Sequence, residues 1–392
     1  MDVHVPSVTK TEQSYNPVTI TQNLIRCPSV TPADAGCMDY VQALLEPLGF
    51  ACHRVSIGDV TNFYARLGSG APHLCFLGHT DVVPAPAHDA WACDPFSGDI
   101  IDDHVYGRGA CDMKGAVACF IAAVYNAVQL GALKGSISLL LTSDEEGTAQ
   151  DGVKKMIPWL RDRGEVIDFC LGGEPTNPTK LGEMAKIGRR GSLTMKLTVG
   201  GKTGHVAYPH FALNPIQPLV QFLNTLLMMP LDNGTDMFDP SHLEITTVDV
   251  GNSISNVIPE SASATLNIRF NPVYTPETLI QLLEEKLDAV RQSCDACFVW
   301  QPQYHCSAEA FLCHDTKFSE MATRVIQQVT GLMPKLSTTG GTSDARFMKD
   351  LCSVFEFGLL SCFAHQTNER AAISDLERLT KIYEGIIVGA QF

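Results

Sequence analysis

The sequence predicts an α/β protein in which a domain with a mostly parallel sheet is interrupted by an inserted α+β domain. At 392 residues the chain is long for one hydrophobic core, so two domains are expected. Short apolar runs alternate with helical stretches up to about residue 188, and this pattern returns after residue 304. Such alternation is typical of a parallel sheet covered by helices. The different pattern between residues 189 and 303 indicates the insertion.

The first α/β segment is expected to follow a loose, polar extension formed by residues 1–16. Proline at position 17 suits the first turn of a helix, which we expect to end near residue 26. β-branched and apolar runs predict buried strands, with helices between them. The expected strands are 63–67, 74–77, 136–141 and 167–171, and the expected helices are 116–130 and 152–163.

The middle segment changes to two-sided strands and amphipathic helices, which predicts a compact α+β unit of ferredoxin-like type. Its expected strands are 193–199, 242–250 and 263–270, and its expected helices are 214–229 and 276–293. The returning α/β segment should contain a helix at 318–329, a strand at 353–357 and a helix at 375–388.

Composition describes a folded protein that does not bind nucleic acid. Hydrophobic residues make up 45% and charged residues 18%, and the net charge of −15 offers no basic run to neutralise phosphates. The longest apolar runs are too short to cross a bilayer, and the polar, proline-bearing start of the sequence leads us to expect no signal peptide. The fourteen cysteines are scattered, and several lie in predicted strands, so we expect free thiols and a cytoplasmic location.

Five side chains of metal-binding type follow predicted strands or lie in glycine-marked loops: His79, Asp112, Glu146, Glu174 and His365. Because the carboxyl ends of parallel strands share one edge of a sheet, such residues can converge there. Imidazole mixed with carboxylates suits zinc or another borderline divalent ion better than magnesium or calcium. The sequence therefore predicts a metal site with two ions.

Separate roles are expected for the neighbouring acids. Asp112 lies between two glycines and is the candidate bridging ligand, while Asp81 is placed to accept the second imidazole N–H of His79. Successive side chains on extended backbone point in opposite directions, so we assign Glu146 to the metal and Glu145 to a general base. Metal-assisted hydrolysis of an amide or peptide bond is the predicted reaction class.

The chain resembles the M20 family of dinuclear zinc peptidases and deacylases. The segments that carry the resemblance are Gly78–Asp81, Gly107–Gly115, Asp144–Gly147, Gly173–Pro175 and His365. The resemblance implies that one zinc is held by His79, Asp112 and Glu174, and the other by Asp112, Glu146 and His365. It also implies that Glu145 acts on a hydroxide shared by the two ions, and that cobalt can replace zinc at one site.

Further segments resemble the members that release succinate from N-succinyl-LL-2,6-diaminopimelate in lysine and cell-wall synthesis. They are Lys186–Ser192, Gly204–His210, Asn256–Pro259, Gly340–Asp344 and His365–Glu369. By this resemblance, residues 17–188 and 304–392 of this chain would form the catalytic domain. Residues 189–303 would form a dimerisation and lid domain. The resemblance also implies a homodimer in which His205 reaches the partner's active site and stabilises an oxyanion.

A substrate with several carboxylates would need local cations and hydrogen-bond donors. Arginine binds carboxylate through a two-pronged fork, so Arg189, Arg190 and Arg269 are candidates, with a surface ion pair as the alternative for each. The remaining candidates for binding the substrate are Asn256, Gly341, Thr342 and Ser343.

Other functions remain open at this point. An acetylornithine deacetylase, an aminoacylase or a carboxypeptidase of the same family would share the metal site and differ only in the substrate pocket. A non-enzymatic scaffold should have lost Glu145 or a ligand. A thiol hydrolase acting through Cys111 would need a nearby histidine, which the sequence does not place there.

Overall fold

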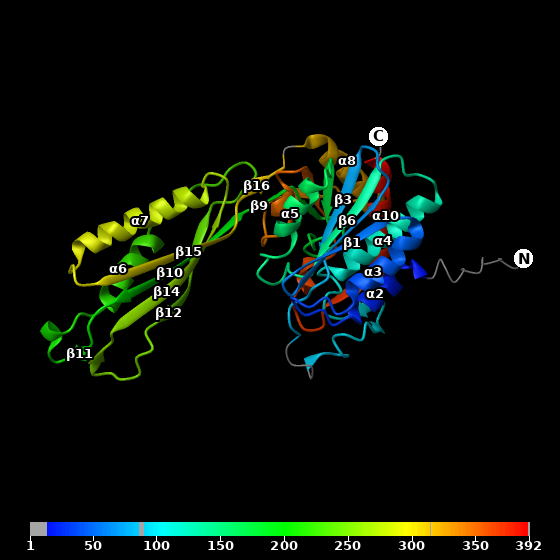
Figure 1. The fold of residues 1–392 in the computed structure, drawn as a ribbon. Helices are drawn as coiled ribbons and strands as arrows, with labels where there is room; N and C mark the ends of the chain where they lie inside the picture. Colours follow the sequence, from blue (N-terminus) through cyan, green and yellow to red (C-terminus); the bar gives the residue numbers. More distant parts are fainter. Residues whose placement is uncertain (1–13, 86–89, 314, 391–392) are drawn as a thin grey trace, which may run out of the picture. The chain divides into compact units, whose positions relative to one another are not determined.

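The computed structural model describes residues 14–85, 90–313 and 315–390, and these divide into two compact units (Figure 1). Unit 1 contains the described residues up to Ile187, together with Cys313–Ser337 and those from Ser343 onward. Unit 2 contains Gly188–Leu312 and Thr338–Thr342. The predicted fold class is confirmed, because unit 1 is an α/β domain and unit 2 is an α+β insertion.

Unit 1 is built on an eight-stranded sheet of order β1-β2-β6-β3-β7-β18-β8-β17. Four central strands, β6, β3, β7 and β18, run parallel, and β1 and β2 add an antiparallel edge. The strands are β1 (Ala51–Ile57), β2 (Val60–Leu67), β3 (His73–His79), β6 (Ser136–Thr142), β7 (Phe169–Gly172), β8 (Met184–Lys186), β17 (Lys335–Ser337) and β18 (Ser353–Glu356). Every residue of β3 and β6 is buried, as expected for strands covered on both faces.

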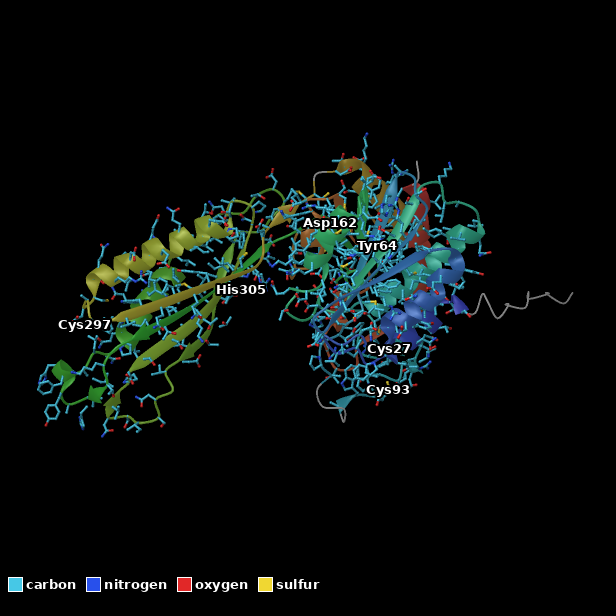
Figure 2. The ribbon with its side chains drawn as sticks, viewed as in Figure 1. Cys27, Tyr64, Cys93, Asp162, Cys297 and His305 are labelled. Carbon is cyan, nitrogen blue, oxygen red and sulfur yellow. The ribbon has the colours of Figure 1, made fainter. Side chains whose placement is uncertain are left out.

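Helices cover both faces of this sheet. On one face, Phe76 of β3 stacks on Phe120 of α4 and meets Tyr383 of α10 edge-on. On the other face, Tyr64 of β2 (Figure 2) packs against Trp159 of α5. The helices of unit 1 are α2 (Pro17–Ile25), α3 (Cys37–Leu45), α4 (Lys114–Gln129), α5 (Val153–Asp162), α8 (Thr316–Thr330), α9 (Ala345–Met348) and α10 (Ile373–Gly389).

A small antiparallel sheet of order β19-β5-β4 brings two distant segments together. Its strands are β4 (Ile100–Ile101), β5 (His104–Tyr106) and β19 (Arg370–Ala372), and Arg370 pairs with Tyr106. The segment after β5 therefore starts beside the segment that ends at β19. These two segments carry Asp112 and His365.

Unit 2 has the βαββαβ connection of a ferredoxin-like domain, with strand order β12-β14-β10-β15. The strands are β10 (Gly191–Gly200), β12 (His242–Asp249), β14 (Ser261–Phe270) and β15 (Val299–Ala308), and the helices are α6 (Ile216–Leu227) and α7 (Pro276–Ser293). Alternate residues of β10 and β14 are buried, and they join side chains of both helices in one core. Unit 2 also contains the short strands β9 (Gly188–Arg189), β11 (Gly204–His205), β13 (Val257–Ile258) and β16 (Phe311–Leu312).

Three features differ from the sequence expectations. The expected second boundary, after residue 303, falls inside β15, a strand that the sequence analysis missed because it contains Pro302. Proline is tolerated there because β15 is an edge strand. Strand β1, the antiparallel partner of β2, and helix α3 were also missed, because short irregular runs carry a weak periodicity.

Residues 1–13 of the expected loose extension lie outside the described part of the chain. At its described end Tyr15 is buried, stacks on Tyr125 and donates a hydrogen bond to the Leu44 carbonyl, so this part is packed. All fourteen cysteines are described and are free thiols, including Cys294 and Cys297, which have two residues between them. Among the described residues, no helix has the length and apolar character needed to span a bilayer.

Candidate metal centre

Three neighbouring parallel strands deliver the first part of the site at one edge of the sheet. His79 is the last residue of β3 and pairs with Thr142, the last residue of β6. Leu77 of β3 pairs with Gly172 at the end of β7, two residues before Glu174. The acids that follow these strands therefore gather around His79, as the parallel arrangement predicts.

The carboxylate of Asp112 lies between the two histidines. Its Oδ1 is 3.3 Å from His79 Nε2, and its Oδ2 is 3.3 Å from His365 Nε2. Glu174 Oε1 lies 3.7 Å from His79 Nε2, and Glu146 Oε1 lies 2.7 Å from His365 Nε2. One carboxylate with an imidazole at each oxygen is the geometry of a bridging ligand.

Three groups of described residues could hold a metal ion, and Asp112 belongs to two of them. The groups are His79 with Asp112 and Glu174, Asp112 with Glu146 and His365, and His79 with Glu145 and Glu146. The first two are the sets predicted from the sequence. The third shows that distance alone does not separate Glu145 from Glu146.

A cation fits this donor set on physical grounds. His79 Nε2 is buried and makes no hydrogen bond. A buried nitrogen without a hydrogen-bond partner needs another partner, and a bound cation would supply it. The contacts with Asp112 and then Glu146 raise the pKa of His365 to about 10, so the acids draw a proton onto its ring. A divalent cation would supply the positive charge that these carboxylates otherwise take from protons.

The contact expected of the Asp81 side chain needs correction. His79 Nδ1 donates to the main-chain carbonyl of Asp81 at 2.9 Å, while the nearer carboxylate oxygen of Asp81 is 3.6 Å away. That carboxylate instead accepts the backbone N–H groups of Glu145 at 3.3 Å and Glu146 at 3.0 Å. Asp81 therefore fixes His79 with its main chain and fixes the glutamate pair with its side chain.

The glutamate pair lies in a turn and not in extended backbone, so the alternation argument does not apply. Asp144 holds this turn from the other end by accepting the N–H groups of Thr148 and Asp151. Glu146 contacts His365, whereas Glu145 lines a small pocket with Glu174 and Asp344. Burial and then the charge of Glu174 raise the pKa of the Glu145 carboxyl, so this carboxylate binds a proton more readily than an exposed glutamate does.

Two of the predicted arginines meet in unit 2 together with a histidine that the sequence analysis missed. Arg269 of β14 is the register partner of His242, and Arg190 lies 3.2 Å from His242 Nδ1. Burial and then the charge of Arg190 lower the pKa of Arg269, so the two cations are held close together. Arg189 is largely buried and donates to the Gly341 carbonyl at 3.1 Å.

The other predicted substrate residues lie in different surroundings. His205 and Asn256 of unit 2 are both exposed. They are neighbours, because β11 pairs with β13 and the Val206 N–H donates to the Asn256 carbonyl. Thr342 is partly exposed in unit 2. Ser343 is fully buried in unit 1 and donates its hydroxyl to Glu356 at 2.5 Å, so that hydroxyl is committed inside the protein. We therefore withdraw Ser343 as a substrate contact.

Sequence reasoning missed a buried ion pair beside the site. Arg108 and Glu369 are 2.8 Å apart, and each stands in a segment that was quoted for the resemblance without being given a role. A charged residue between two glycines, and an acid four residues after a histidine, were the available signals. Neither signal indicates by itself that the two residues meet.

Comparisons with known proteins identify a family and similar proteins for this chain. A model of peptidase family M20/M25/M40 matches residues 75–388. A Rhodospirillum centenum protein named succinyl-diaminopimelate desuccinylase is 50% identical over 378 residues, which cover 95% of this chain and 96% of the relative.

Solved structures share the fold at low identity. An M20 family metallo-carboxypeptidase from Sulfolobus solfataricus superposes with a TM-score of 0.80 at 17% identity, covering 96% of this chain and 99% of its own. A Bacillus subtilis protein described as a dinuclear metal binding peptidase from the M20 family gives 0.72 at 14% identity, covering 97% and 98%. Because the family model spans most of the chain and the curated relative matches nearly all of it, the chain belongs to the M20/M25/M40 peptidase family.

Proposed function

We propose that this protein is a metal-dependent amide hydrolase that releases succinate from N-succinyl-LL-2,6-diaminopimelate. The observation that carries the proposal is the match to a desuccinylase over 95% of the chain at 50% identity. The shared position of Asp112 between His79 and His365 supports the metal-dependent chemistry.

The proposed cofactor is two zinc ions, with cobalt able to occupy one position. His79, Asp112 and Glu174 would hold one ion, and Asp112, Glu146 and His365 the other. Two such ions, when bound, acidify a water and polarise the carbonyl of the amide.

The chain's own residues would then move the proton. Glu145 lies beside His79 and Glu146 and lines a small pocket with Glu174, and we assign its carboxylate to accept the proton of the attacking water. The same carboxyl then donates this proton to the leaving nitrogen. Asp81 keeps the Glu145 backbone in place while the carboxyl changes its charge.

The arginines of unit 2 are the proposed carboxylate-binding groups. Arg190 and Arg269 lie close together, and no ion pair with an acid is observed for either among the described residues. Adjacent guanidinium groups repel each other, and a bound carboxylate would relieve that repulsion through charge-assisted hydrogen bonds.

A homodimer formed through unit 2 is the proposed assembly. β12 is an edge strand whose residues are largely exposed, and an open edge can pair with a second chain. Val220 and Leu227 of α6 are seven residues apart and more than half exposed, so they give the same helix face an apolar surface. His205 is the exposed group proposed to enter the partner's site.

The zinc-loaded protein should hydrolyse N-succinyl-diaminopimelate with a kcat/KM at least about 100-fold above that for N-acetylornithine, because only the first offers a dicarboxylate acyl group and two amino-acid ends. Glu145→Gln should reduce kcat by at least about 100-fold while leaving two metal ions bound. Side-by-side product assays and elemental analysis test both statements. Preference for N-acetylornithine would favour the deacetylase alternative, and activity of the variant with metal lost would exchange the roles of Glu145 and Glu146.

Replacing Arg269 with Met should raise KM for N-succinyl-diaminopimelate by about 10- to 100-fold and change kcat much less. The physical reason is the loss of a charged hydrogen bond, worth about 1.5–3 kcal/mol, between the protein and a substrate carboxylate that does not take part in the reaction. Steady-state kinetics provides the measurement. Arg291→Met is the control, since Arg291 pairs with Glu284 and Asp288 on α7. Equal KM values for the two variants would remove Arg269 from the substrate site.

His205→Ala and Glu145→Gln homodimers should each be inactive, and a mixture that exchanges subunits should recover about a quarter of wild-type activity. Half of the dimers are then mixed, and each has one complete site when histidine comes from the partner. The assay compares the mixture before and after refolding together. If the mixture stays inactive while both proteins form dimers, His205 does not act across the interface.

A further inference from the structure

Arg108 is a buried cation that connects three segments around the metal centre. Its side chain is 2% exposed, and Nη1 donates to Glu369 Oε2 at 2.8 Å and to the Gln366 carbonyl at 3.2 Å. Nη2 lies 3.4 Å from the carbonyls of Pro84 and His365 and donates to both. The guanidinium of Arg108, which stands in the segment that leads to Asp112, thus binds the loop after β3 and the loop that carries His365.

Glu369 completes this connection from the opposite side. It is fully buried, and its Oε1 accepts the backbone N–H groups of Cys111 and Asp112, each at 3.1 Å. The thiol of Cys111 donates to the same oxygen at 3.3 Å. The main chain of Asp112 is therefore held by the acid that Arg108 neutralises.

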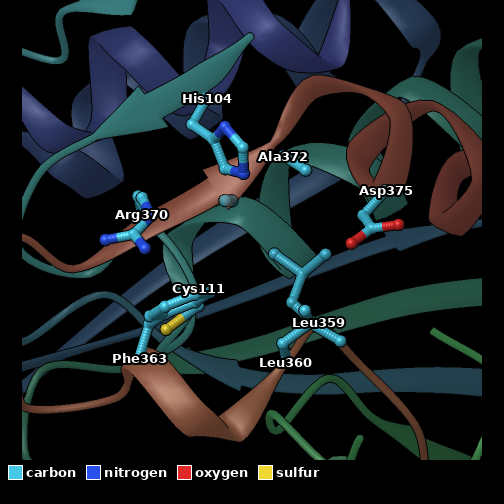
Figure 3. A pocket seen from close by; sticks show the side chains of 9 residues that line it. His104, Cys111, Leu359, Leu360, Phe363, Arg370, Ala372 and Asp375 are labelled. Carbon is cyan, nitrogen blue, oxygen red and sulfur yellow. The ribbon is translucent and has the colours of Figure 1, made fainter. Parts of the chain in front are cut away.

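The loop that carries His365 needs such support. His365 has a φ of 61° and Asn368 also has a φ of 61°, and residues with a side chain rarely adopt this left-handed conformation. Such backbone persists only where the surroundings fix it. Cys111 and Phe363 line one small pocket together, which shows that the two loops lie side by side (Figure 3).

We propose that the Arg108–Glu369 pair is a positioning unit for the ion site made by Asp112, Glu146 and His365. The pair sets the separation of Asp112 and His365 through their main chains and touches none of the ligating atoms. The inference rests on the ligand sets of the proposed function.

The two ion sites should depend on the pair unequally. His79 is held independently, at the end of β3 and by the Asp81 carbonyl, whereas His365 depends on Arg108 for a main-chain contact. Removing an outer partner of a metal ligand commonly weakens metal affinity by about 10- to 100-fold. We expect this loss at the His365 site.

The test is a Co²⁺ titration of the metal-free protein, followed by visible absorption and calorimetry. Glu369→Gln keeps the size of the side chain but loses the charge, and Arg108→Lys keeps the charge but loses the fork. Glu165→Gln is the matched control, because Glu165 pairs with Arg66. Arg66 stands opposite Ser138 near the start of β6, at the other end of the sheet from His79.

Wild type and Glu165→Gln should bind two Co²⁺ ions with equal affinities. Glu369→Gln and Arg108→Lys should bind the first ion as wild type does and the second about 10- to 100-fold more weakly, with an altered spectrum of the second ion. Circular dichroism shows whether each variant is folded. If one variant does not fold, the Co²⁺ titration of the other variant tests the inference.

Binding of both ions as in wild type, or equal weakening of both, would overturn the inference. Unfolding of both variants would also overturn it, since the pair would then serve the fold instead of one site. A wild-type protein that binds fewer than two ions would contradict the proposed function instead.

Discussion

The site depends on one carboxylate shared by two imidazoles. Asp112 presents Oδ1 to His79 and Oδ2 to His365, each at 3.3 Å, although the histidines stand 286 positions apart in the chain. The parallel sheet delivers His79, and the pairing of β5 with β19 brings the His365 loop beside the Asp112 loop. Both routes must end at the same carboxylate for two ions to bind next to each other.

Electrostatics explains why this arrangement calls for cations. Asp112, Glu146 and Glu174 gather around two histidines, and two like charges about 4 Å apart repel by about 4 kcal/mol at an effective dielectric constant of about 20. Protons on the histidines reduce this repulsion, as the raised pKa of His365 shows. Divalent ions would reduce it more strongly and, in the proposed function, would leave Glu145 available for proton transfer. The Arg108–Glu369 pair adds one buried cation beside the site without changing its net charge.

Much of the fold, and the gathering of the candidate ligands at one place, could be predicted from the sequence, because both follow from strong local patterns. Continuous apolar runs mark β3 and β6, and acids at the ends of such strands indicate a shared rim. Strand β15 was missed because an edge strand tolerates Pro302. The contact of Asp81 was misjudged because no sequence pattern tells whether His79 donates to the carboxylate of Asp81 or to its main-chain carbonyl. The pairing of Arg108 with Glu369 and of Arg190 with His242 depends on long-range contacts, which one sequence does not display.

The most direct test of the shared carboxylate is zinc-edge anomalous diffraction from crystals of the zinc-loaded protein. We expect two anomalous peaks on opposite sides of Asp112, one beside His79 Nε2 and the other beside His365 Nε2. A single peak, or peaks that do not both contact Asp112, would contradict the two-ion site from which the proposed activity follows.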